Sequence, residues 1–144
     1  MADPRLTVSW DGLGAEYASF KSDNSTIVYS ATTSGGSAGV GLAVTLIAAT
    51  AQTIELVGDA EGVLGKLIKV EVDNIANVQI AGAMTLPAGD AATLTRQKSI
   101  VGALGVAAVE GYIRDVDTAA PAELGVRRGF VIDDAVSTAA WVWL

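Results

Sequence analysis

The sequence of 144 residues contains no histidine and no cysteine. It therefore lacks the imidazole and thiolate groups that most often act as bases, nucleophiles and metal ligands near neutral pH, and it cannot form a disulfide. Basic residues are also scarce, since nine Lys and Arg stand against sixteen Asp and Glu, for a net charge of -7. Because phosphate binding requires clustered positive charge, this balance argues against a nucleic-acid partner.

Long hydrophobic runs are missing as well. The most apolar stretch extends from Gly39 to Ala51 and is interrupted by Thr45 and Thr50. A membrane-spanning helix needs about 20 predominantly apolar residues, so a buried strand is the better interpretation and no membrane partner is expected. The first residues, Met1–Arg5, are not followed by the apolar core of a signal peptide.

Short runs of alternating apolar and polar residues are present in their place. In Lys66–Val72, the pattern places Ile68, Val70 and Val72 on one face of a strand and Lys69 and Glu71 on the other. Strict alternation of this kind is typical of a half-buried β-strand. Further strand candidates, separated by Gly, Asp, Asn and Pro turn signals, are Thr26–Tyr29, Val40–Ile47, Thr53–Val57, Asn77–Ala81, Ala83–Leu86, Ala92–Thr95, Ile100–Leu104, Glu110–Val116, Gly129–Asp133 and Ala139–Leu144. This spacing predicts an all-β domain, either a small sandwich or a barrel-like fold.

We expect at most one short helix. Thr118 is a candidate cap, with Pro121 near the first turn and Gly125 at the end. The stretch Ala103–Val109 also has helical composition, but neighbouring glycines weaken that assignment.

The first 24 residues differ from the rest and are predicted to form an extended N-terminal arm or peripheral segment. Within them, Leu6–Trp10 alternates like a strand, and Lys21–Ser25 is a polar loop. Residues 25–144 are predicted to form a single β-rich domain. Leu6, Val8 and Trp10 are apolar residues on an otherwise polar arm, which makes them candidates for contacts with a neighbouring molecule.

No motif predicts catalytic, cofactor-binding or metal-binding residues. Gly35–Gly39 matches the G-x-S-x-G nucleophile elbow around Ser37, but the chain has no histidine to accept the serine proton. Asp115 and Asp117 begin like a calcium loop, yet alanines follow where a ligand and a glycine are needed. An ion pair of Arg114 with Asp115 and a turn at Asp133-Asp134 are the expected structural roles.

Aromatic and basic residues near the C-terminus are the stronger interface candidates. The alternation of Trp141-Val142-Trp143-Leu144 places both indoles on one face. Burial in the domain's own core is our first interpretation and burial at a subunit interface the second. Arg127 and Arg128, flanked by glycines, are interpreted as a solvated turn or a subunit-interface pair.

Five ordered blocks of sequence resemble a known family. They are Gly62–Glu71, Thr85–Gly89, Ser99–Leu104, Gly111–Val116 and Arg128–Asp133. Together they are similar to the head decoration, or capsid cement, proteins of tailed bacteriophages, especially those of actinobacterial hosts. The resemblance spans about Gly62 to Leu144 and consists of strand-and-turn blocks rather than a catalytic signature.

This resemblance implies a small, β-tulip-type domain on the exterior of the virion's capsid. It implies a non-enzymatic, cofactor-free protein whose partners are the major capsid protein and two further copies of itself. Such homotrimers bridge capsomers at three-fold or quasi-three-fold positions and stabilise the shell. It further implies that Arg127 and Arg128 could pair with acidic residues of the shell.

Two alternatives remain open at this point. One is another structural module of the virion, from a tail or fibre, and the other is a receptor- or glycan-binding β domain that uses Trp141 and Trp143. An enzyme would have to rely on carboxylates alone.

Overall fold

The computed structural model describes residues 12–133 and 139–144. Regular structure in these residues is dominated by strands, with one short α-helix. The elements are β1 (Glu16–Ser22), β2 (Ala43–Leu46), β3 (Thr53–Leu56), β4 (Gly65–Val70), β5 (Ile75–Ala81), β6 (Ala83–Pro87), β7 (Ile100–Ala103), β8 (Tyr112–Asp115), α1 (Pro121–Val126), β9 (Phe130–Asp133) and β10 (Ala139–Trp143). The prediction of a small all-β, barrel-like domain is confirmed.

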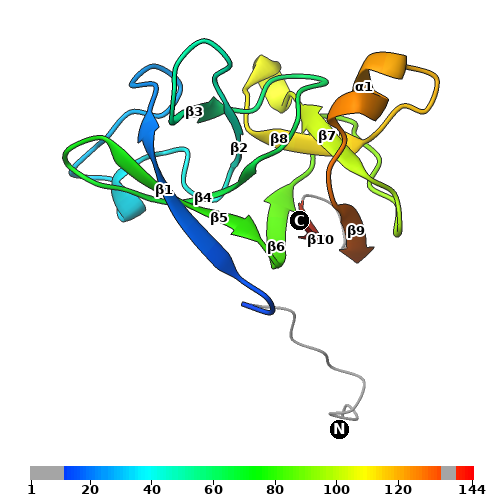
Figure 1. Ribbon diagram of the computed structural model, residues 1–144, viewed down its shortest axis with the longest axis horizontal. Coiled ribbons are helices and arrows are strands. Elements are labelled where there is room, and N and C mark those ends of the chain that lie inside the picture. Colours follow the sequence, from blue (N-terminus) through cyan, green and yellow to red (C-terminus); the bar gives the residue numbers. More distant parts are fainter. Residues whose placement is uncertain (1–11, 134–138) are drawn as a thin grey trace, which may run out of the picture.

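The first five strands form a closed barrel in the order β1-β3-β2-β4-β5 (Figure 1). The long antiparallel pairing of β1 with β5 closes the barrel on one side, and a short parallel pairing of β1 with β3 closes it on the other. Aliphatic side chains, most of them branched, fill the interior. They are Ile27, Val44, Ile54, Leu56, Leu67, Val70, Ala76 and Val78.

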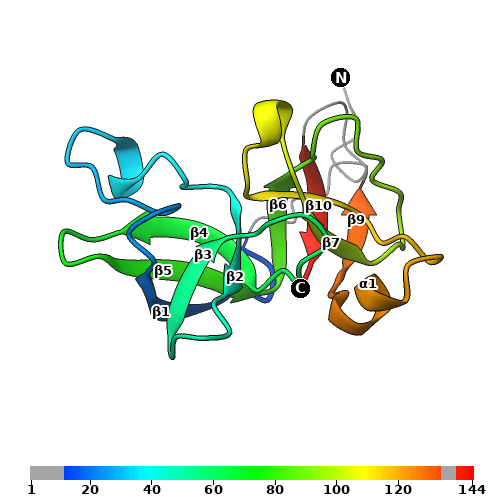
Figure 2. The same cartoon turned by 90° about the horizontal axis from the view of Figure 1, so that it is seen from above.

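The remaining strands form a three-stranded sheet, β6-β10-β9, and a two-stranded ladder, β7-β8. Figure 2 shows the barrel strands on one side of the molecule and these strands, with α1, on the other. A second core lies among them and extends to the barrel through Ala43, Val57 and Val63. Its other buried members are Met84, Leu86, Ile100, Ile113, Val131, Ala140 and Val142.

The chain passes from the barrel to the second sheet through a single residue, Gly82, between β5 and β6. Gly82 has a φ of +91°, and a Cβ atom at this position would lie 2.5 Å from the backbone of Gly14. Only glycine combines this left-handed conformation with such a close approach. Nearby, Lys66 Nζ on β4 donates a 2.9 Å hydrogen bond to Thr85 Oγ1 on β6, which also links the two parts.

The alternating run that predicted β4 does form a strand, but its faces are not those expected. Leu67 and Val70 point into the barrel, Ile68 is only half-buried, and Val72 is 75% exposed. A register shift between Leu67 and Lys69 in the pairing with β5 explains the difference. A bulge adds one residue and reverses the alternation beyond it.

The prediction that places residues 16–22 in an arm is wrong, because these residues form β1 and complete the barrel. The residues of β1 that are more buried are Ala18, Phe20 and Ser22, and only one of them is a large apolar residue. Because this alternation of apolar and polar residues is weak, sequence analysis does not predict the strand. Residues 1–11, including the proposed strand Leu6–Trp10, lie outside the described residues.

Two further predicted strands do not form. Thr26–Tyr29 begins in a turn closed by the Asp23 carboxylate, which accepts hydrogen bonds from the backbone N–H groups of Thr26 at 2.7 Å and Ile27 at 2.9 Å. Ala92–Thr95 runs beside β8, but Thr95 N–H donates to the Asp115 carboxylate rather than to a ladder carbonyl. In both segments a side-chain carboxylate accepts hydrogen bonds from backbone N–H groups that a regular ladder would pair with carbonyls.

The helix predicted between Pro121 and Gly125 is confirmed as α1, with Pro121 in its first turn. Thr118 is not its cap, since Ala120 holds that position. The helical alternative for Ala103–Val109 is limited to an irregular turn, Val106–Ala108, in which Ala107 and Ala108 both have a φ of 60°.

Candidate functional site

Trp141 and Trp143 lie on the outer face of the three-stranded sheet. The core side of β10 is formed by Ala140 and Val142, which are 1% and 0% exposed, whereas both indoles are half-buried. The first interpretation, burial in the domain's own core, is therefore wrong. Trp10, Leu6 and Val8 belong to residues that the structure does not describe.

The outward indoles have an aromatic neighbour on the next strand. Trp143 pairs with Phe130 of β9, which is 43% exposed. The other side of Trp143 lies against Gly14, where an added Cβ atom would be 3.0 Å from the ring. We call Trp141, Trp143 and Phe130 the aromatic face. Half-exposed aromatic rings clustered in this way are typical of binding surfaces.

Arg127 and Arg128 have different environments, although they are adjacent. Arg127 is exposed, and its backbone N–H donates to Glu123 O at the end of α1. Arg128 is half-buried and reaches across to the barrel, where Nη1 donates to Leu64 O at 2.6 Å and Nη2 to Ile80 O at 2.7 Å. Arg128 thus holds the two parts of the molecule together and is neither a solvated turn residue nor a free interface residue.

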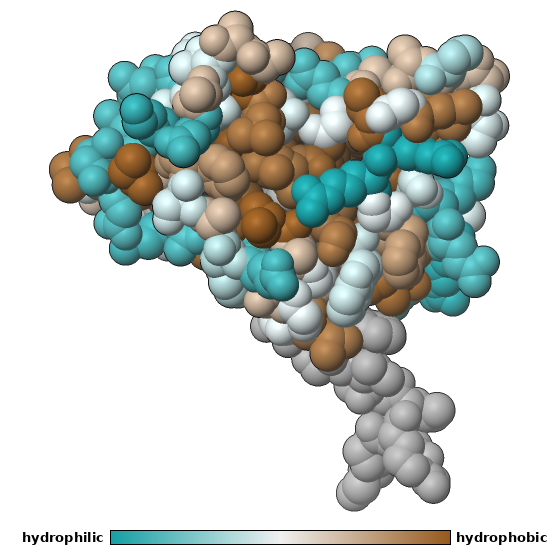
Figure 3. Space-filling view, viewed as in Figure 1, coloured by the Kyte–Doolittle hydropathy of each residue, from teal (hydrophilic) through white to brown (hydrophobic). Residues whose placement is uncertain are grey.

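Apolar side chains surround this Arg128 contact. Leu64 and Ile80 are partly buried at the barrel, and Val126 on α1 is 42% exposed beside Gly62. Figure 3, viewed as Figure 1, shows hydrophobic side chains gathered over the middle of the molecule, with hydrophilic side chains crossing them. We call Leu64, Ile80 and Val126 the junction surface.

A third feature is a charged network on β8 and α1. Arg114 forms two hydrogen bonds with Glu123, at 2.9 Å from Nη1 and 2.7 Å from Nη2, and a third at 3.2 Å from Nε to Asp59. Glu123 is only 6% exposed and also accepts a hydrogen bond from the backbone N–H of Asp117. The bonds from Arg114 first, and then the one from Asp117 N–H, hold the pKa of Glu123 below its ordinary value. The bonds to Glu123 first, and then the one to Asp59, raise the pKa of Arg114.

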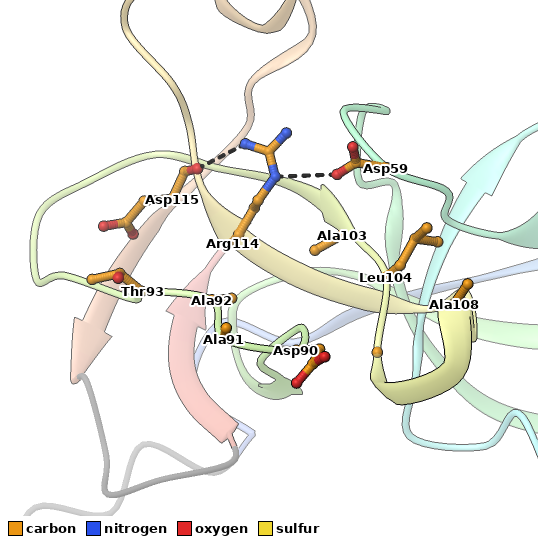
Figure 4. A pocket seen from close by; sticks show the side chains of 11 residues that line it. Asp59, Asp90, Ala91, Ala92, Thr93, Ala103, Leu104, Ala108, Arg114 and Asp115 are labelled. Carbon is orange, nitrogen blue, oxygen red and sulfur yellow. Dashed lines mark hydrogen bonds and ion pairs between the residues drawn. The ribbon is translucent and has the colours of Figure 1, made fainter.

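Beside this network, Figure 4 shows an open hollow between β8, the loop 90–93 and the end of β7. Its volume is about 570 Å³. Sequence analysis missed this feature because its lining comes from separate segments that share no motif.

The carboxylates and the serine singled out by sequence have structural partners. Ser37 is buried, and its Oγ accepts a hydrogen bond from Gly39 N–H at 3.2 Å. Asp117 Oδ1 accepts one from Ala119 N–H at 2.8 Å, and Asp133 pairs with Arg96 at 2.9 Å. The Asp115 carboxylate accepts two hydrogen bonds from Thr95 N–H, so the expected Arg114–Asp115 contact is made only through the Asp115 carbonyl. Asp134 lies outside the described residues.

Negative charge accumulates around β3. Partial burial raises the pKa of Glu55, and the neighbouring carboxylates of Glu61, Asp23 and Glu110 raise it further. Asp23 shows the opposite shift: burial acts against its charged form, but the N–H groups of Thr26 and Ile27 outweigh it and lower the pKa. Across the residues that the structure describes, no group of three acidic side chains is arranged to hold a metal ion.

No protein-family model, curated protein or solved structure matches the chain. Within residues 12–133 and 139–144, no helix has the length and apolar character needed to cross a membrane.

Proposed function

We propose that this protein is a structural component of a tailed-phage head, which binds the outside of the assembled capsid as a trimer and ties neighbouring capsomers together. The observation that carries a binding role is the outward placement of Trp141, Trp143 and Phe130 on the second sheet. The resemblance of the segments from Gly62 onward to decoration proteins directs that role to a capsid.

The distribution of side chains supports binding over chemistry. The candidates for chemistry in the described residues, Ser37, Asp115 and Asp117, are engaged in hydrogen bonds that hold loops in place. Large apolar groups at the aromatic face and the junction surface are left partly exposed. Burial of such groups contributes about 25 cal/mol per Å² of apolar surface removed from water.

The mechanism is mass action on the shell. A protein that binds the assembled, expanded capsid but not its dissociated subunits stabilises the assembled state by about 2.7 kcal/mol per site at a concentration 100 times its Kd. A trimer makes three linked contacts, which raises the effective affinity without any new contact. A small domain with modest surfaces can therefore stabilise a large shell.

The test is co-sedimentation of the purified protein with undecorated, expanded heads. We expect saturable binding, and we expect Trp141→Ala and Trp143→Ala each to weaken it at least tenfold, since truncated aromatic anchors typically cost 1.4 kcal/mol or more. Val72→Ala is the matched control, because Val72 is 75% exposed at the far end of the β4–β5 hairpin. Absence of binding at micromolar protein would refute the proposal.

A second candidate, a glycan-binding module of a tail or fibre, is favoured by the same outward indoles, since sugar rings stack on aromatic faces. Copy number separates the two: hundreds of copies per particle support the cement role, and a handful supports the tail or fibre. Quenching of tryptophan fluorescence by a glycan panel would support sugar binding.

A further inference from the structure

The hollow beside β8, which we call the acidic hollow, combines small apolar walls with carboxylates at its rim. Ala91, Ala92, Ala103, Leu104 and Ala108 form the walls (Figure 4). The charged groups around it are Asp59, Asp90, Asp115 and Arg114. An alkyl chain would contact methyl groups on several sides, and its end would meet negative charge.

The positive charge at the rim is already matched inside the protein. Arg114 donates two hydrogen bonds to Glu123, whose carboxylate is nearly buried, and a third from Nε to Asp59. The Asp90 carboxylate, in contrast, has no hydrogen bond or ion pair to any residue in the described ranges. The rim therefore carries an excess of negative charge with one carboxylate available.

The backbone that shapes the hollow is held in place. Asp90 N–H donates to Leu104 O at 2.9 Å, which ties the two loops together, and Asp115 N–H donates to Thr93 O at 3.1 Å. Ala91 and Ala108 have left-handed φ values of 51° and 60°. Such conformations are unfavourable for alanine and persist where the surroundings impose them, so the hollow is preformed rather than induced.

We propose that the acidic hollow receives the side chain of an arginine or lysine presented by a partner polypeptide. The apolar walls fit the aliphatic stem, and the Asp90 carboxylate attracts the charged end, because Asp59 and Asp115 are already engaged with Arg114 and with Thr95 N–H. A compact metal ion fits less well, because the carboxylates are too dispersed to form a ligand set. The proposal stands on the hollow itself and holds whether or not the partner is a capsid protein.

The test uses the full chain and two small probes, Nα-acetyl-arginine amide and its neutral analogue Nα-acetyl-citrulline amide, titrated while ¹H–¹⁵N NMR spectra are recorded. We expect saturable shifts with the arginine probe at Ala91, Ala92 and Ala108, with a Kd in the millimolar range expected for a ligand of this size. The citrulline probe should bind at least fivefold more weakly. Equal binding of both probes, or no saturable shift with the arginine probe, would overturn the proposal.

Variants at one position separate charge from shape. Asp90→Asn should weaken binding of the arginine probe at least threefold, and Asp90→Glu, which keeps the charge, should retain it. Asp73→Asn, at the β4–β5 turn, is the control for loss of one carboxylate elsewhere and should leave the affinity unchanged. The dispersion of the NMR spectrum reports whether each variant is folded. Unchanged affinity in Asp90→Asn would contradict the proposal.

Discussion

Replacement of Arg128 by alanine is the most direct test of how the two parts of the molecule are joined. The guanidinium donates two short hydrogen bonds, to Leu64 O and to Ile80 O. A hydrogen bond from a charged donor contributes about 1.5–3 kcal/mol, and loss of the donor leaves two partly buried carbonyls without it. Because Arg128 is half-buried and water can reach the site, we take the lower half of that range for each of the two bonds and expect Arg128→Ala to lower the free energy of unfolding by about 3–4.5 kcal/mol.

The adjacent Arg127 provides a matched control, because it carries the same charge and is exposed. Arg127→Ala should change stability by less than about 0.5 kcal/mol, as surface substitutions usually do. Urea unfolding followed by tryptophan fluorescence, with linear extrapolation, measures both values. Arg128→Lys should fall between them, since one ammonium group cannot reproduce the fork that reaches two carbonyls. The reasoning fails if Arg128→Ala and Arg127→Ala are equally stable.

Two further predictions follow from the same contacts. The lowered pKa of Glu123 means that its charged form stabilises the fold at pH values above its ordinary pKa of 4.5, and that this contribution is lost as the pH falls through the lower, folded-state pKa. Glu123→Gln should therefore lower the free energy of unfolding at pH 7 by about 2 kcal/mol and make the free energy of unfolding less dependent on pH below 4.5. Urea unfolding at several pH values measures both effects. The assigned ion pair with Arg114 would be contradicted if the pH dependence below 4.5 were unchanged in the variant. Deletion of residues 1–24 removes β1 and should unfold the barrel, measured by circular dichroism; a folded 25–144 fragment would show that β1 is dispensable.

The sequence predicts most strands of this fold but not how the first five strands pair to close a barrel. Alternation and turn residues locate β2 to β10 within a few residues, because each of these strands carries at least two apolar residues between turn signals. β1 is not predicted from the sequence, because Ala18 and Ser22, on its more buried side, give no hydrophobic signal. Its position is determined by pairing with β5, which lies more than fifty residues away, and local sequence carries little information about such contacts.

The candidate site is likewise predicted only in part by the sequence. Composition predicts a surface that binds rather than reacts, and the period of two correctly places Trp141 and Trp143 on one face of β10. Which face is buried depends on the sheet that β10 joins, so alternation could not show that both indoles point outward. The role of Arg128 depends on two carbonyl groups 64 and 48 residues distant, and no motif encodes that geometry.

Salt can separate the two contributions that this surface would make to binding. Arg114 is paired with Glu123 within the molecule, so neither of these charges is offered to a partner, whereas the Asp90 carboxylate is exposed. Attraction between the acidic hollow and a cationic side chain would be screened at 0.5 M salt, where the Debye length is about 4 Å, whereas burial of the aromatic face would not weaken. If the partner uses both, salt should reduce affinity to a plateau: Asp90→Asn should remove the salt-dependent part, and Trp143→Ala should lower the plateau. Complete loss of binding in salt would indicate that the aromatic face contributes little.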